Sequence, residues 1–239
     1  MAEKTTWYPV PLKYTVLIAS LSITTPVSSA TTQPNKDLKK IDIEVSAIDN
    51  RVYVAEADFI VEAPYQDVWE VIIDIDHMDQ FMKNFLYGRT VSEADAKVLL
   101  DWKDRSFQEI REFIDRDKSP VDKRLKKAVW GQEVENYVVE FFDLPWPIKN
   151  RWVIFKCWDR AGDRVLTRKV EAVGGLMKGY GLWRVEPHPE NPSWTVVHFG
   201  NTTILDFQVP KFIGKRVSRY ASESASESVR DRVEQLAMQ

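Results

Sequence analysis

The hydrophobic pattern of this chain changes between a period of two residues and helical spacing. Apolar residues spaced 3–4 positions apart predict three helices. The first is opened by Ala63-Pro64 and continues to Ile75, the second is a short helix at His77–Asn84, and the third is a long helix at Lys211–Met238. Alternating or apolar runs predict strands. The predicted strands cover 41–45, 51–62, 86–93, 133–142, 151–159, 164–173, 179–186 and 193–206.

The long C-terminal helix has a run of small residues at its centre. A helix packed tightly on a large sheet normally presents bulkier side chains, so small ones indicate either close backbone packing or an unfilled space. Both interpretations stay open from the sequence. The small residues are Ala221, Ser222, Ser224, Ala225, Ser226 and Ser228.

The stretch Phe141–Asp159 joins two strand-like runs through a segment containing Pro145 and Pro147. Each proline fixes φ and removes a backbone donor, so this connection is predicted to be an extended, rigid turn between antiparallel strands.

Residues 94–130 carry many charges of both signs, with apolar residues 3–4 apart. This pattern predicts a helical insertion of two or three helices, broken at Ser119-Pro120. A strand at Ala96–Trp102 is the alternative for its first part. The insertion could be a solvated surface element, a lid over a cavity, or a contact surface for a partner protein.

The first 30 residues resemble a targeting segment. Lys4 and Lys13 precede an apolar stretch, and small residues up to Ala30 suit signal-peptidase cleavage. We therefore expect a signal peptide at 1–30, a linker at 31–40 and one domain at 41–239. Cleavage would make the protein exported, either periplasmic or secreted. The alternative is a tail or an uncleaved interfacial anchor, with a cytoplasmic protein.

Composition narrows the chemistry. The net charge is −3 and no basic stripe is present, which argues against nucleic acid as a partner. Nine Trp and eleven Phe favour large apolar surfaces, in a core or around a cavity. Cys157 is the only cysteine, and the three histidines are scattered. We therefore predict no metal site and no cofactor, and Cys157 is expected to be a buried, inert thiol.

Four motifs in order resemble the START-related (SRPBCC) helix-grip superfamily, which includes polyketide cyclase/dehydrase-like and lipid-transfer members. The motifs are Ala63–Trp69, Leu144–Trp152, Gly181–Val185 and Asp206–Gly214. This resemblance implies an α+β helix-grip fold, in which a curved antiparallel sheet wraps around the long C-terminal helix. It also implies an apolar cavity that binds a lipid, sterol, quinone or polyketide. Transient membrane contact is a further expectation. The insertion at 94–130 is longer than the superfamily's usual link.

Strand alternation and helical spacing then predict which side chains face this cavity. Arg151 is expected either to pin the Pro-Trp-Pro turn, which is the favoured role, or to bind a ligand headgroup. The predicted ligand-binding residues are Phe142, Arg151, Phe155, Trp183, Phe199, Thr203, Tyr220 and Ala225.

The alternative function is a cyclase/dehydrase-type enzyme working in the same cavity. His198, Arg184 and Glu140 interrupt apolar strands and could steer proton transfer there. A solvated outer sheet face explains the same three residues, so no catalytic residue is assigned from the sequence.

Overall fold

The structure, a computed structural model, describes residues 41–102, 105–116, 133–144, 151–162, 165–175 and 178–238. The predicted signal peptide and linker, the Pro145–Asn150 turn and residues 117–130 of the insertion lie outside these ranges.

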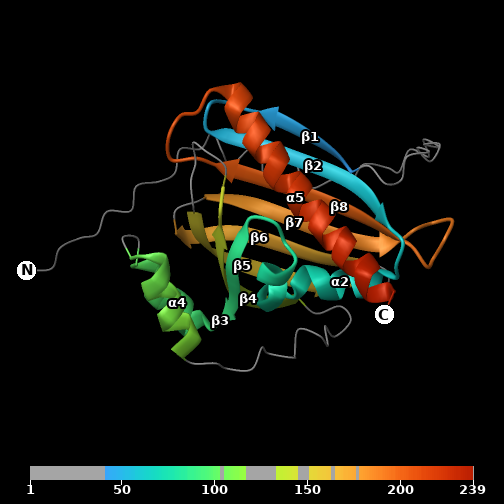
Figure 1. The fold of residues 1–239 in the computed structure, drawn as a ribbon, viewed down its shortest axis with the longest axis horizontal. Helices are drawn as coiled ribbons and strands as arrows, with labels where there is room; N and C mark the ends of the chain where they lie inside the picture. Colours follow the sequence, from blue (N-terminus) through green and yellow to red (C-terminus); the bar gives the residue numbers. More distant parts are fainter. Residues whose placement is uncertain are drawn as a thin grey trace, which may run out of the picture. The chain divides into compact units, whose positions relative to one another are not determined.

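The described residues build an eight-stranded sheet in which every neighbouring pair is antiparallel (Figure 1). Its order is β1-β2-β8-β7-β6-β5-β4-β3. The last strand, β8, therefore pairs with β2 from the start of the chain. The sheet is curved and open, as the helix-grip prediction requires. The strands are β1 Asp42–Ala47, β2 Val52–Val61, β3 Phe85–Val91, β4 Glu133–Phe142, β5 Arg151–Ala161, β6 Leu166–Gly175, β7 Lys178–Pro187 and β8 Thr195–Ile204.

The helices follow the predicted order. They are α2 Tyr65–Ile73, the 3-10 helix η1 Ile75–Gln80, α3 Glu93–Leu100, α4 Phe107–Arg116 and the long α5 Lys211–Ala237. Helix α5 contains 27 residues and begins directly after Pro210. It crosses one face of the sheet and contacts β1, β2, β8 and α2 (Figure 1). We call this face the inner face and the opposite one the outer face.

The two halves of α5 meet the inner face differently. In the C-terminal half, Val229 and Val233 are buried in a core that includes Val185 and Val197 of the sheet. Near the N-terminus, Gly214 lies against the ring of Tyr53, whose hydroxyl donates to the Val209 carbonyl at 3.0 Å. Between these anchors the helix presents the small residues noted above.

Helices α3 and α4 pack on the outer face. Ala96, Leu99 and Ile110 are buried there among Val139, Phe141, Trp152 and Ile154, while Glu140 and Phe142, at alternate positions of β4, point to the inner side. The rings of Phe107 and Phe141 lie 4.5 Å apart.

This placement corrects two expectations for the insertion. The described part is not a lid, because it covers the sheet face opposite the cavity described below. The strand alternative at Ala96–Trp102 is also wrong, since α3 is a helix capped by Ser92 Oγ, which accepts from the Asp95 amide at 3.0 Å. The two helices cover an aromatic patch that would otherwise be exposed.

Candidate functional site

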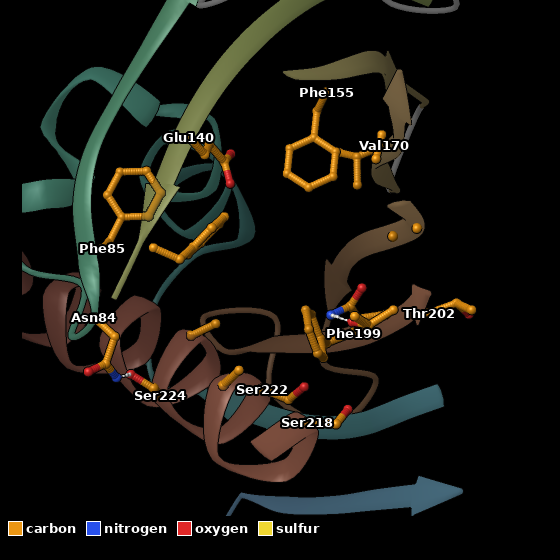
Figure 2. Close-up of a pocket in the computed structure, with 18 of the residues that line it drawn as sticks. Asn84, Phe85, Glu140, Phe155, Val170, Phe199, Thr202, Ser218, Ser222 and Ser224 are labelled. Carbon is orange, nitrogen blue, oxygen red and sulfur yellow. Dashed lines mark hydrogen bonds between the residues drawn. The ribbon is translucent and has the colours of Figure 1, made fainter. Parts of the chain in front are cut away.

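A mostly apolar cavity of about 200 Å³ lies between the inner sheet face and α5. A single water needs about 10–15 Å³ on the same measure, so this space can hold a small organic molecule. Its walls come from α2, η1, strands β2 to β8 and the N-terminal half of α5, and Figure 2 shows part of this lining. The apolar lining residues include Ile75, Met78, Met82, Phe85, Phe142, Phe155, Val170, Trp183 and Phe199.

The cavity exists because small residues face each other across it. On the sheet, Gly179 and Gly181 lie at inward positions of β7, and a Cβ added to Gly181 would come 2.6 Å from Val170 Cγ2. On the helix, Ala221 and Ala225 line the same space. A side chain on Gly179 would collide with the Thr202 carbonyl, whereas bulkier residues at Ala221 and Ala225 would fill the space. The open alternative for the small-residue run is therefore the one observed.

Seven of the eight sequence-predicted site residues lie on the cavity wall: Phe142, Phe155, Trp183, Phe199, Thr203, Tyr220 and Ala225. Arg151 does not belong to the described lining. Arg151 is the first residue of β5, and its guanidinium lies 5.8 Å from the centre of the Phe207 ring. The Pro-Trp-Pro turn that it was predicted to pin lies outside the described residues. Whether these side chains bind a ligand stays a prediction.

Glu140 is the one carboxylate on the enclosed part of the wall, among the residues that the structure describes. Its side chain points into the cavity from β4 (Figure 2), and it keeps some accessible surface there. Burial raises the pKa of Glu140 to about 7, although the nearby positive charge of Arg168 opposes this rise. At neutral pH the group is therefore divided between a neutral acid and a carboxylate.

A second ionic group, formed by Arg168 and Asp159, is fully packed. Both side chains are 3% exposed, and Arg168 Nε lies 3.1 Å from Asp159 Oδ1. Arg168 also donates to the Ile72 carbonyl at 3.0 Å, and Asn136 Nδ2 donates to Asp159 Oδ2 at 2.9 Å.

Sequence reasoning missed Arg168 and Asp159 as cavity-side residues. The sequence contained a signal for both residues. Arg168 lies two positions from Leu166 and from Val170, and Asp159 lies two positions from Cys157, so each shares a strand face with an apolar residue. An inward position in a period-two pattern places even a charged residue inside.

His198 and Arg184 lie on the outer face, away from the cavity. His198 Nδ1 is 2.7 Å from Asp58 and its Nε2 is 3.2 Å from Glu186, which also accepts from Arg184 at 2.6 Å. The solvated-face interpretation of these two residues is therefore correct. Of the three catalytic candidates, only Glu140 borders the cavity.

Serine hydroxyls of α5 form a polar stripe along the cavity. Ser224 Oγ donates to the Lys83 carbonyl at 3.2 Å, and Asn84, at φ 63°, donates to Ser224 at 3.4 Å. Ser218 and Ser222 also line the cavity, are 9% and 1% exposed, and have no hydrogen-bond partner among the described residues. Figure 2 shows them on the wall opposite Glu140.

The described residues give little support to a cysteine nucleophile or a metal site. Burial raises the pKa of the Cys157 thiol to about 12, so it is not a ready nucleophile. Within the described ranges, no group of three or more His, Cys, Asp or Glu side chains is placed to hold a metal. No helix in the described part of the chain is long and apolar enough to cross a membrane.

The chain matches no family model, and no curated protein matches its sequence. Solved structures do resemble it. Human StAR-related lipid transfer protein 5 aligns at a TM-score of 0.56 with 10% identity, covering 93% of this chain and 95% of that one. Human STARD10 aligns at 0.54 with 8% identity, covering 97% and 82%. A STAR-related lipid transfer protein fragment from Xanthomonas axonopodis aligns at 0.51 with 13% identity, covering 80% and 98%.

At these identities the similarity concerns the fold alone. The chain has the START-like helix-grip fold, which confirms the fold predicted from its motifs.

Proposed function

We propose that this protein binds a hydrophobic small molecule, of lipid, sterol, quinone or polyketide type, in the cavity between the sheet and α5. The binding serves transport, sequestration or presentation. The observation that carries the proposal is an apolar cavity with small residues on both its sheet wall and its helix wall. The lipid-transfer proteins that share the fold support it.

Native mass spectrometry with organic extraction tests this proposal. Protein purified under native conditions should carry an extractable apolar compound, and Ala225→Trp, which fills the cavity, should lose it. Gln235→Trp is the matched control, since Gln235 is exposed near the end of the same helix and does not line the cavity. Protein that is empty from several expression hosts and binds no added lipid would contradict the proposal.

A cyclase/dehydrase-type enzyme in the same cavity is the second candidate. It is favoured by Glu140, because an enclosed carboxyl with a pKa near 7 suits general acid–base catalysis. In that case Glu140→Gln should lower turnover of a bound polyketide-like substrate at least 100-fold while its Kd changes little. Equal turnover in wild type and Glu140→Gln would eliminate this candidate.

We further propose transient contact with anionic membranes through the first turns of α5. Phe212 is 74% exposed there, next to the exposed Lys211, Lys215, Arg216 and Arg219. An apolar anchor surrounded by cations suits an anionic lipid surface. Phe212→Ser should weaken flotation with phosphatidylserine vesicles, whereas Met238→Ser, 80% exposed at the other end of α5, should not. Equal flotation of both variants would contradict this contact.

We also propose export, on the basis of the N-terminal pattern. N-terminal sequencing of protein from its native host should begin at Thr31. A mature protein that begins at Met1 or Ala2 would contradict this proposal.

A further inference from the structure

The polar groups on the cavity wall indicate the chemistry of the ligand, beyond its being apolar. Among the described residues, Glu140 makes no hydrogen bond or ion pair, and the Ser218 and Ser222 hydroxyls have no partner. Buried polar groups are normally hydrogen-bonded, and an unpaired one destabilises the fold. Three unpaired groups around one cavity therefore point to partners supplied by a ligand.

Among the lining residues that the structure describes, no interior cation is free to receive an anionic ligand. The guanidinium of Arg168 is already held by Asp159, the Ile72 carbonyl and, at 3.5 Å, Asn136 Oδ1. The other two cationic lining residues, Lys83 and Lys178, are exposed at the rim of the cavity. A carboxylate inside would meet Glu140 without a compensating charge.

The two polar positions also differ in what they can do. Protonated Glu140 donates one hydrogen bond and still accepts others, whereas a serine hydroxyl both donates and accepts. Uncharged hydroxyl or carbonyl oxygens satisfy both positions without adding a charge to the interior.

We propose that the cavity selects an uncharged amphipathic ligand with two oxygen functions, one bound by Glu140 and the other by Ser218 and Ser222. This inference rests on the proposed function, since it specifies the ligand of the same cavity. It makes Glu140 and the serine pair determinants of specificity.

Calorimetric titration with matched probes of 6–12 carbons tests the first half. The probes are 1-alkanols, 1-alkylamines and alkanoates of equal length. The alkanol should bind at least 10-fold more tightly than the alkanoate at pH 8, and this preference should grow several-fold from pH 6 to pH 8, because Glu140 loses its proton and then repels the alkanoate. Glu140→Gln should remove that pH dependence, and Glu186→Gln, on the outer face, should keep it.

Tighter binding of the alkanoate, or of the amine at pH 8, would overturn the proposal. An alkanoate preference that Lys178→Gln abolishes would move the headgroup to the rim and overturn it equally. Equal affinities for all three probes would overturn the proposal but leave the proposed function standing. Failure of every probe to bind would overturn both.

The α,ω-alkanediols test the second half. In wild-type protein the best-fitting diol should bind at least as tightly as the alkanol of equal length. In Ser218→Ala/Ser222→Ala the diol should become about 10-fold weaker than the alkanol, because its second hydroxyl is then buried without a partner.

Ser226→Ala is the matched control, since its hydroxyl is equally buried and unpaired but does not line the cavity. Both serine variants remove unpaired hydroxyls and should fold. A diol that stays as tight in the double variant as in wild type would overturn the role of the serines.

Discussion

The sheet carries an arginine among carboxylates on each of its faces, and the two groups differ in almost every other respect. On the inner side, Arg168 and Asp159 are direct cross-strand partners and are 3% exposed. On the outer side, Arg184 is the cross-strand partner of His198 and pairs with Glu186 at 45% exposure. Side chains of the same types thus form a packed ion pair on one face of the sheet and a hydrated cluster on the other.

The comparison shows that position, more than charge, decides what such a group contributes. In water an ion pair gains little, because solvent screens it and the side chains lose entropy. Inside, neither partner can be removed without leaving the other unpaired in an apolar environment. Glu140 lies beside the inner group and faces the cavity, and no described residue pairs with it.

The largest expected effect comes from breaking the inner pair. Arg168→Leu leaves Asp159 buried and unpaired, and should lower the free energy of unfolding by about 3–5 kcal/mol. Arg184→Leu, the same change on the outer face, should cost less than about 1 kcal/mol. Urea unfolding at pH 7 measures both, and similar losses would abolish the distinction drawn between the faces.

A double variant sharpens this result. Asp159→Leu/Arg168→Met replaces the whole pair with apolar side chains, and should recover most of the stability that Arg168→Leu loses. A double variant as unstable as the single one would show that Arg168 stabilises the fold through its bond to the Ile72 carbonyl instead.

A smaller effect is expected from Glu140, and it depends on pH. The pKa of Glu140 is raised from 4.5 to about 7 by burial, so the unfolded chain ionises first as pH rises. Wild-type stability should therefore decrease between pH 4.5 and pH 7, by up to about 3 kcal/mol. Glu140→Gln does not titrate and should be more stable than wild type at pH 8 but not at pH 4.

Glu186→Gln provides the control with opposite sign. Burial alone would raise the pKa of Glu186, but hydrogen bonds from Arg184 and His198 outweigh it and the pKa is lowered. Its stabilising contribution is therefore present above pH 4.5 and is lost as pH falls, so Glu186→Gln should be less stable than wild type at pH 8. If both variants respond to pH alike, Glu140 is not enclosed.

The period-two pattern predicted most of the fold and much of the cavity wall. Phe155, Trp183 and Phe199 were placed on the inner face from alternation alone, and the structure has them on the cavity wall. The superfamily motifs supplied the topology, which no local pattern contains.

Two features were beyond local patterns. The outward aromatics Phe141 and Trp152 need a cover, but only the tertiary structure shows that α3 and α4 provide it. The small residues of α5 were ambiguous because close packing and a cavity require the same side chains. The cavity that the structure places between the sheet and Ala221 and Ala225 decides between them.

The smallest expected effect belongs to His198. A hydrogen bond to Asp58 raises its pKa, burial opposes this, and Glu186 adds to the rise. The stabilisation is therefore fully present below pH 6.5 and is lost as pH rises through the folded-state pKa. His198→Gln should lower stability by a few tenths of a kcal/mol at pH 5.5 and by less at pH 8.5. Chemical denaturation at the two pH values checks this, and a larger loss at pH 8.5 would reverse the assignment.

The central claim is that the space between the sheet and α5 is a ligand site. A crystal structure of protein purified natively, without added ligand, tests it most directly. We predict continuous non-protein density among Phe155, Phe199 and Ala225, with an oxygen within hydrogen-bond distance of Glu140. A structure in which α5 has closed onto the sheet, with Ala221 and Ala225 packed against Gly181, would contradict the claim.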